Sequence, residues 1–513
     1  MIVKLIGLLL LALLACLAVA LARALAMKPT LAKTAQPPKA DESRAKVYGE
    51  KLCAMVRIET VSSRYDPDRE KFRAFQESLR ELFPNVFAAC EAHHPGDGLV
   101  LHLRSENPTG EPILLMSHHD VVEASPEGWD HAPFSGDIDE EGRVWGRGTV
   151  DTKGSLMCEL QALEELLEQG WKPEKDVYIT SSCTEEWSGP CAPAIVAWLK
   201  ERNVHLGMLL DEGGMILEEP VGGVKGRYAM VGVLEKGYGD VRFIARSHGG
   251  HASAPKKNSP LPRLGALMQD IDKHSPFTAQ ITPTVREMFT RLAPNSSFAL
   301  KLVFGNLWLF GPLLKKAMPM ISPAAAAMMQ TTCAFTTAKG SEGLNVLPTV
   351  ASVTANLRFI HHQPNEESLA LLEKRAKKYD VEMEVITQDH PCPIVDYTAK
   401  PFGLVEKVTA QIYPGYGVVP YVMTGGTDAK YYGDVCEHCL RFAPIEINNQ
   451  QYGSIHSVNE NLHASALVPA VDFYKQVLVR YCAGDMLYCT HVQKYSCKHF
   501  DHDMQYAGRK VSA

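Results

Sequence analysis

Residues 113–122, ILLMSHHDVV, are the most informative segment of the chain, because here an apolar run ends abruptly in a His-x-Asp motif. Such a run is typical of a strand that is buried on both faces of a parallel sheet. Residues two apart in an extended segment point to the same side, so His118 and Asp120 can act together. The imidazole would bind a metal ion, and the carboxylate would fix the orientation of the ring. The motif alone does not establish a metal site, and the case depends on the strands that follow it.

Two later apolar runs also end in acidic residues. The run VYITSSC is followed by Glu185 and Glu186, and the run LGMLL is followed by Asp211. A glycine-rich turn places Asp151 at the start of an amphipathic helix, and the spacing of its glycines matches neither GxGxxG nor GxxxxGK(S/T), which excludes a nucleotide site. Ligands of open α/β sheets bind beyond the carboxyl ends of the strands. Carboxylates and an imidazole gathered there predict a divalent cation.

Length, composition and charge narrow the class of protein. The chain has 513 residues, which is enough for about two to four domains, and its hydrophobic content of 46% is that of a folded globular protein. A net charge of −7, without a basic patch interleaved with aromatic residues, argues against nucleic acid as a partner. From about residue 236 the wholly apolar runs are replaced by segments in which apolar and polar residues alternate. This change predicts an α+β insert, which contains the sequence HGGHASAP that begins at His248.

Both ends of the chain differ in composition from the rest. Residues 5–22 are apolar and uncharged, at the threshold length for spanning a bilayer. Segment 1–27 is therefore either a retained signal anchor or, because it contains Ala-x-Ala tripeptides, a cleaved signal peptide. The protein would be membrane-associated in the first case and secreted in the second, with the side of the membrane left open. A linker over 28–42 follows, and the Cys- and His-rich tail 485–513, whose spacing matches no zinc module, is interpreted as a polar tail.

The order and spacing of the motifs resemble one family over nearly the whole chain after residue 43. The matching motifs are His118-x-Asp120, GTVDTKG around Asp151, Glu185-Glu186, Asp211-Glu212-Gly213 and His456. The family is the zinc-dependent group of aminoacylase, carboxypeptidase G, acetylornithine deacetylase and succinyl-diaminopimelate desuccinylase. The sequences LDEGG and GGTD and the leading apolar segment are most similar to its carboxypeptidase S and N-fatty-acyl-amino-acid hydrolase branch.

The resemblance implies an α/β fold with a zinc-peptidase-like catalytic domain that has a mixed central sheet. It also implies an inserted α+β lid or dimerisation domain, preceded here by the N-terminal apolar helix. The catalytic domain would occupy residues 43–235 and 361–484, and the lid would occupy residues 236–360. A homodimer formed through the lid is therefore expected.

The resemblance also implies two zinc ions per subunit, with Co²⁺ or Mn²⁺ as possible substitutes. Asp151 would bridge the two ions. His118 and Asp211 would complete one site, and Glu186 and His456 would complete the other. The chemistry agrees, because two ions held close together need a bridging anion.

The remaining roles concern catalysis and substrate binding. Glu185 matches the general base, and Asp120 matches the residue that orients His118. The two adjacent acids would then have different roles. Glu186 cannot accept a proton while it binds metal, so Glu185 acts as the base. In the lid, His251 resembles a residue that reaches the active site of a partner subunit and stabilises the transition state. The pocket for a substrate carboxylate would be formed by four residues: Arg358, Asn345, Gly425 and Gly426.

The resulting hypothesis is a dinuclear zinc hydrolase that cleaves a peptide or N-acyl amide bond next to a free carboxylate. Its substrate would be a small peptide or an N-acyl amino acid. A dipeptidase or deacetylase of the same family is the alternative enzyme. A membrane-tethered pseudoenzyme that only binds ligands is the alternative from another class, and the presence of every ligand and of the base disfavours it.

Overall fold

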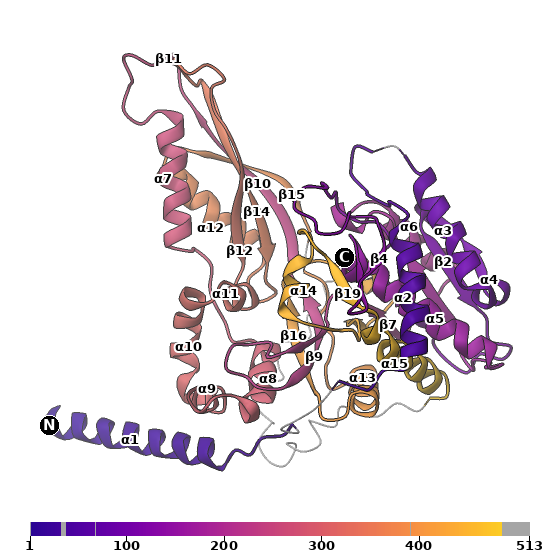
Figure 1. The fold of residues 1–513 in the computed structure, drawn as a ribbon. Helices are drawn as coiled ribbons and strands as arrows, with labels where there is room; N and C mark the ends of the chain where they lie inside the picture. The colour runs from indigo at the N-terminus through magenta and orange to yellow at the C-terminus, as the bar shows by residue number, and fades with distance from the viewer. Residues whose placement is uncertain (1, 32–36, 67, 390, 485–513) are drawn as a thin grey trace.

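The computed structural model describes residues 2–31, 37–66, 68–389 and 391–484. The tail for which the sequence predicts a polar segment lies outside the described residues. Figure 1 shows a main body on the right, a long insert that projects from it at upper left, and α1 (Ile2–Ala26), which leaves the molecule at lower left. We call the first two the catalytic body and the lid, after the domains that the resemblance implies.

The catalytic body is built on a mixed sheet, as the resemblance implies. The strands follow the order β1-β2-β6-β3-β7-β17-β9-β8-β18, and β16 pairs with β9 in parallel. β3 lies between β6 and β7 and runs parallel to both. The bounds are β1 (Glu91–His93), β2 (Leu99–Leu103), β3 (Ile113–Met116), β6 (Val177–Ser181), β7 (Met208–Asp211), β8 (Ile216–Glu218), β9 (Arg227–Glu235), β16 (Gly417–Met423), β17 (Cys439–Arg441) and β18 (Glu446–Ile447).

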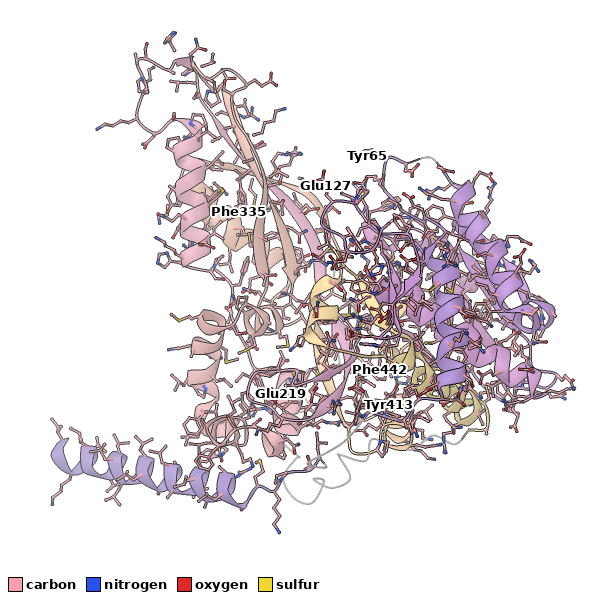
Figure 2. The ribbon with its side chains drawn as sticks, in the orientation of Figure 1. Tyr65, Glu127, Glu219, Phe335, Tyr413 and Phe442 are labelled. Carbon is pink, nitrogen blue, oxygen red and sulfur yellow. The ribbon has the colours of Figure 1, made fainter. Side chains whose placement is uncertain are left out.

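Helices cover both faces of this sheet, and β3 shows why the strand must be wholly apolar. Ile113 and Leu115 belong to one core cluster, whereas Leu114 and Met116 belong to another. Helices that begin at Glu42, Gly154, Lys400 and Ala464 contribute to the first cluster, and the helix that begins at Cys191 contributes to the second. Alternate side chains of a strand point to opposite faces, so both sets are buried. In Figure 2, Tyr413 and Phe442 mark the first of these clusters.

The elements around the sheet complete the catalytic body. The helices are α2 (Glu42–Val56), α3 (Glu70–Leu82), α4 (Pro84–Ala89), α5 (Gly154–Glu168), α6 (Cys191–Glu201), α13 (Lys400–Ile412), α14 (Asn449–Ser454) and α15 (Ala464–Cys482). A small sheet has the order β19-β5-β4, with β4 (Asp137–Ile138), β5 (Arg143–Trp145) and β19 (Asn461–His463).

The lid contains an antiparallel sheet of order β12-β14-β10-β15. Its strands are β10 (Gly237–Arg246), β12 (Thr332–Lys339), β14 (Val350–Phe359) and β15 (Glu382–Gln388), and α7 (Pro260–Lys273) and α12 (Asn365–Lys378) pack on it. Phe335, labelled in Figure 2, lies on this sheet. The sequence assigned residues after 360 to the catalytic domain, and this boundary is wrong for α12 and β15. Pairing of β15 with β10 completes the lid sheet, a long-range contact that no local pattern reveals.

The insert also contributes a group of helices that pack on the catalytic sheet. These helices are α8 (Pro283–Leu292), α9 (Phe298–Phe304), α10 (Leu307–Ile321) and α11 (Pro323–Met329). Their apolar residues share a core cluster with β9 and β16, and α1 contacts α9. At the opposite tip of the lid, β11 (Gly250–His251) pairs with β13 (Val346–Leu347).

Candidate active site

The site forms where three neighbouring strands end. His118 follows β3, the short helix η3 (Glu185–Trp187) follows β6, and Glu212 follows β7. The three strands are parallel and adjacent, so their carboxyl ends meet at one edge of the sheet. Asp151 reaches the same edge from η2 (Thr149–Lys153), the turn before α5.

Two groups of possible metal ligands share the carboxylate of Asp151. One group is His118, Asp151 and Glu212, the other is Asp151, Glu186 and His456, and the ligand atoms within each group lie within 4.8 Å of one another. One oxygen of Asp151 lies 3.0 Å from Nε2 of His118, and the other lies 3.0 Å from Nε2 of His456. The Asp151 carboxylate therefore faces both groups, one oxygen to each, which is the geometry that a bridging ligand requires.

Glu212, and not Asp211, faces the first group, which corrects the ligand predicted from sequence. Oε1 of Glu212 lies 3.7 Å from Nε2 of His118. The carboxylate of Asp211 instead accepts hydrogen bonds from the backbone N–H of Glu212, at 2.8 Å, and of Ala429, at 3.0 Å. Consecutive residues at a strand end point to different sides, so the pattern DEGG leaves open which acid faces the site. Through the bond from Ala429, the Asp211 side chain links the end of β7 to η5 (Asp428–Asp434).

The acid pair at the end of β6 is held by Asp120. Its carboxylate accepts hydrogen bonds from the backbone N–H of Glu185, at 3.2 Å, of Glu186, at 3.3 Å, and from the hydroxyl of Ser62. Nδ1 of His118 lies 2.8 Å from the backbone oxygen of Asp120 and 3.4 Å from its carboxylate. The main-chain carbonyl therefore makes the closer orienting contact with His118, and the carboxylate mainly positions the acid pair.

Glu185 lies beside the two groups without joining either of them, and its Oε2 is 3.9 Å from Nε2 of His118. Burial raises the pKa of Glu185 well above its ordinary value, His118 opposes this rise, and Asp428 adds to it. Burial also raises the pKa of Glu186 to about 7. Hydrogen bonds to Asp151 and then to Glu186 raise the pKa of His456 to about 10.

The donor set fits divalent cations. The two groups bring together three carboxylates and only two imidazoles. Carboxylates held this close repel one another unless positive charge lies among them, which metal ions would supply. Carboxylate oxygen and imidazole nitrogen are the ligands that zinc takes in hydrolytic sites, and cobalt and manganese accept the same atoms. The two groups are therefore candidate metal sites.

Sequence reasoning missed Glu460, which joins the turn of Asp151 to the segment of His456. One of its oxygens accepts hydrogen bonds from the backbone N–H of Gly148, Val150 and Asp151, at 2.8–3.1 Å. The other is 2.6 Å from Nη1 of Arg147, in an ion pair whose side chains are 3% and 0% exposed. The only signal in the sequence is a charge four residues after His456, and such a charge is ordinarily solvated.

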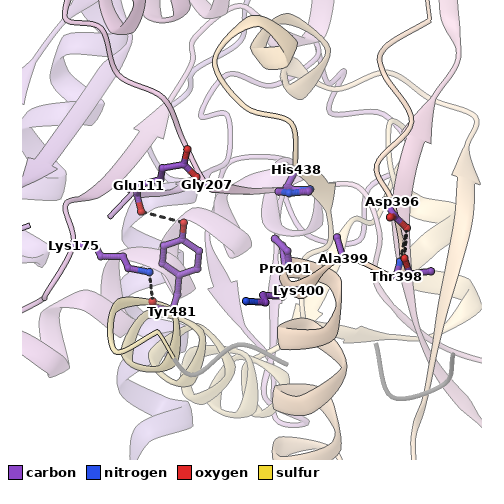
Figure 3. Close-up of a pocket in the computed structure, with 10 residues that line it drawn as sticks. All are labelled: Glu111, Lys175, Gly207, Asp396, Thr398, Ala399, Lys400, Pro401, His438 and Tyr481. Carbon is purple, nitrogen blue, oxygen red and sulfur yellow. Dashed lines mark hydrogen bonds between the residues drawn. The ribbon is translucent and has the colours of Figure 1, made fainter. Parts of the chain in front are cut away.

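A cavity of about 370 Å³ lies elsewhere in the catalytic body. Figure 3 shows that Tyr481 and Lys175 lie at its wall, where the Tyr481 hydroxyl donates to the backbone oxygen of Glu111 and Lys175 donates to that of Tyr481. Glu111, Lys175 and Gly207 precede β3, β6 and β7. The cavity is therefore at the amino ends of these strands, opposite the candidate metal groups, and contains no residue of the predicted site.

The fold and the site together define a metal-dependent hydrolase: a mixed α/β body with acids and histidines at the carboxyl edge of its sheet, and an inserted lid. The sequence model of Peptidase family M20/M25/M40 matches residues 114–480, and the chain belongs to this family. It is an enzyme, a metallopeptidase or an N-acyl-amino-acid hydrolase, and the family generally binds zinc.

The chain matches known relatives over most of its own length and over most of theirs. The chain is 31% identical to the N-fatty-acyl-amino acid synthase/hydrolase PM20D1 of Xenopus tropicalis, over 85% of this chain and 86% of that protein. It is 30% identical to the probable carboxypeptidase S-like 2 of Dictyostelium discoideum, over 81% of each. These relatives confirm the predicted resemblance to that branch.

Solved structures show the same fold at lower identity. A metallo-carboxypeptidase of the M20 family from Sulfolobus solfataricus superimposes with a TM-score of 0.64 at 16% identity, covering 85% of this chain and 99% of that chain. The dipeptidase Dug1p of Saccharomyces cerevisiae superimposes with a TM-score of 0.62 at 17% identity, covering 86% and 97%.

Proposed function

We propose that the chain is a dinuclear zinc hydrolase that cleaves a peptide or N-acyl amide bond next to a free carboxylate. The observation that carries the proposal is the position of Asp151, which offers one oxygen to each of two groups of ligands. His118 and Glu212 would complete one site, and Glu186 and His456 would complete the other. Two zinc ions there would polarise the scissile carbonyl and lower the pKa of the attacking water.

Glu185 is the base in this proposal. It lies beside both groups and its carboxylate is left for proton transfer. Glu185 accepts a proton from the attacking water as the new C–O bond forms, and it delivers that proton to the nitrogen as the C–N bond breaks. The raised pKa caused by burial suits a group that must both accept and release a proton.

Arg358 is the proposed partner of the substrate carboxylate. It stacks over the ring of Tyr238, its neighbour across β10 and β14, at 5.0 Å, and makes no ion pair with any of the described residues. A Cβ added to Gly426 would lie 3.4 Å from Nη1 of Arg358, so the Gly425-Gly426 turn gives the guanidinium room. A guanidinium can bind a carboxylate through two parallel hydrogen bonds.

His251 and Asn345 lie together at the tip of the lid, away from the catalytic body. The backbone oxygen of Asn345 accepts from the N–H of Ala252 at 2.9 Å, next to His251. Nδ1 of His251 accepts from the N–H of Ser253 at 3.1 Å, so the neutral ring carries its proton on the exposed Nε2. An exposed ring N–H supports the proposal that the lid forms a homodimer and that His251 donates to the oxyanion in the partner's site.

The names of two relatives support the proposed substrate class. PM20D1 is named as an N-fatty-acyl-amino acid synthase/hydrolase, and the Dictyostelium relative is named as a carboxypeptidase. Both names agree with an amide substrate that carries a free carboxylate. We also propose that α1 anchors the enzyme in a membrane, because it is the one helix among the described residues long and apolar enough to cross a bilayer.

A substrate panel tests the function. The zinc-loaded full chain is expected to hydrolyse fatty-acyl amino acids, acetyl amino acids or dipeptides, and to lose most of kcat/KM when the carboxylate is converted to a methyl ester. The loss of a charge-assisted hydrogen-bonded pair predicts a decrease of about 10- to 100-fold. Release of the free amino product measures the rate. Equal rates on acid and ester would refute the proposed carboxylate pocket.

Replacing Glu212 tests the corrected ligand. Glu212→Gln is expected to reduce bound zinc from about two ions to about one ion per chain, because one site loses an anionic ligand. Elemental analysis after gel filtration measures this content. Glu219→Gln, an exposed acid labelled in Figure 2, is the control and should retain both ions. Loss of zinc from Asp211→Asn but not from Glu212→Gln would restore the assignment made from sequence.

A further inference from the structure

The end of α1 is fixed to the helices of the insert. Ala20 and Ala24 are buried, and Nδ2 of Asn306 donates to the backbone oxygen of Ala20 at 3.0 Å. Nζ of Lys301, on α9, donates to the backbone oxygen of Met27 at 3.2 Å. These contacts set where α1 leaves the body, and most of the remaining helix is exposed.

The chain after α1 is held in the same place. Oδ1 of Asn295 accepts from the backbone N–H of Thr30, at 3.1 Å, and of Leu31, at 3.2 Å. Met27 and Leu31 pack against the core cluster that the insert helices share with β9 and β16. A free tether would need none of these contacts, so the body lies at a defined place beside the end of α1.

The insert exposes large apolar side chains beside this attachment. Phe298 on α9 is 50% exposed, and on α10 Trp308, Leu313 and Met320 are 47%, 66% and 87% exposed. We call these four residues the insert patch. Lys316 and Met320 are four residues apart and share one exposed side of α10, whereas Leu307 and Leu314 are buried on the other side.

Basic side chains accompany the insert patch. Lys315 and Lys316 are exposed on α10, and Arg23 and Lys28 are exposed at the end of α1. A short helix that exposes Trp, Leu and Met together with Lys has the composition of a helix that lies in the interface of a bilayer. Trp is the aromatic residue most suited to the headgroup level, because its ring is apolar and its N–H is polar.

The direction of the helices agrees with this composition. Figure 1 shows α10 along the edge of the body on the side to which α1 projects, running across the direction of α1. α9 contacts both helices, and the bend between α9 and α10 is 105°. A helix of 25 residues is about 37 Å long, enough to cross a hydrocarbon core of about 30 Å. If α1 crosses the bilayer, α10 lies close to the plane of its surface.

We propose that the insert patch on α9 and α10 is a second membrane contact, which inserts its apolar side chains into the interface of an anionic phospholipid bilayer. This inference rests on the proposed anchoring by α1. The bilayer is favoured as occupant because α9 and the residue before α10 hold the end of an apolar helix of membrane-spanning length. Exposed lysines on α10 also accompany the patch. Two contacts would hold the body in one orientation on the membrane.

Tryptophan fluorescence in vesicles tests the inference on the full chain. α1 contains no tryptophan, so quenching by brominated acyl chains reports only on the body. In vesicles of brominated phosphatidylcholine and phosphatidylglycerol, we expect the fluorescence of Trp308 in the wild-type chain to be quenched. The Trp308→Phe variant lacks this emission and should not show the corresponding loss. The loss should be about one sixth of the total, since six tryptophans are present. Trp198→Phe, on α6, is the matched control, and its Trp308 should be quenched as in the wild-type chain.

The outcomes separate the two proposals. Co-flotation of the chain with vesicles, without quenching that depends on Trp308, would leave the anchor in place and overturn the second contact. Absence of co-flotation would overturn both. Iodide quenching of Trp308 can also be measured without lipid, at increasing protein concentration. If this quenching decreased as the protein concentration rose, a second copy of the chain would cover the patch, and the membrane proposal would be wrong. Leu313→Asp should reduce the quenching of Trp308 while co-flotation persists.

Discussion

Glu185→Gln is expected to lower kcat by about 100- to 10,000-fold, the usual contribution of a general base, while bound zinc stays unchanged. The amide keeps the shape and the hydrogen-bonding backbone of Glu185 but cannot accept a proton from water. Since Glu185 joins neither group of ligands, its removal should not release metal. Steady-state hydrolysis and elemental analysis on the same sample measure both quantities.

The matched control for this variant is Glu127→Gln, an exposed acid in the loop after β3, labelled in Figure 2. It should retain the wild-type rate. A rate for Glu185→Gln within a few-fold of the control would refute the assignment of the base, and a fall in zinc would make Glu185 a ligand instead.

The same variant tests the contribution of the lid from the partner subunit. His251→Ala should also be slow, because the oxyanion loses a donor. Mixing the two variants forms some dimers in which one site has both an intact Glu185 and an intact partner His251. Recovery of activity on mixing is expected, and a mixture no more active than its components would show that His251 does not act across subunits.

Glu460→Ala is expected to lower the free energy of unfolding by about 3–5 kcal/mol, the usual cost of breaking a buried ion pair. The change leaves the guanidinium of Arg147 buried without its carboxylate and removes the acceptor of three backbone N–H groups. One of these groups belongs to Asp151, so the variant should also bind zinc less tightly. The midpoint of urea-induced unfolding and a zinc titration measure the two effects.

The exposed ion pair of Glu106 and Lys172 provides the control, because both side chains are more than 70% exposed. Glu106→Ala should change the free energy of unfolding by less than about 1 kcal/mol. If Glu460→Ala unfolded at the same urea concentration as this control, the buried pair would have no structural role. The double variant Arg147→Met/Glu460→Leu should recover part of the lost stability, since no charge is left unpaired.

The amino-acid sequence was sufficient to predict which segments carry the chemistry. The apolar run before His118 is buried on both faces because helices cover both sides of a parallel strand, and this burial leaves a signal that can be read residue by residue. Motif order and spacing were enough to predict the family, the mixed sheet and the convergence of Asp151 with His118 and His456. These features depend on local pattern and on the parallel order of the strands.

Side-chain directions and contacts between distant segments became visible only in the folded molecule. The fold corrected the sequence prediction at several points. It turned Asp211 to the backbone and Glu212 to His118, because neighbouring residues at a strand end face different sides. It placed β15 in the lid through pairing with β10, and it brought Glu460 to the turn of Asp151. It also attached α1 to the insert helices through Asn306, the residue that precedes α10. A pattern read along the chain contains no such information, because the partners are more than a hundred residues apart or differ only in the direction of one side chain.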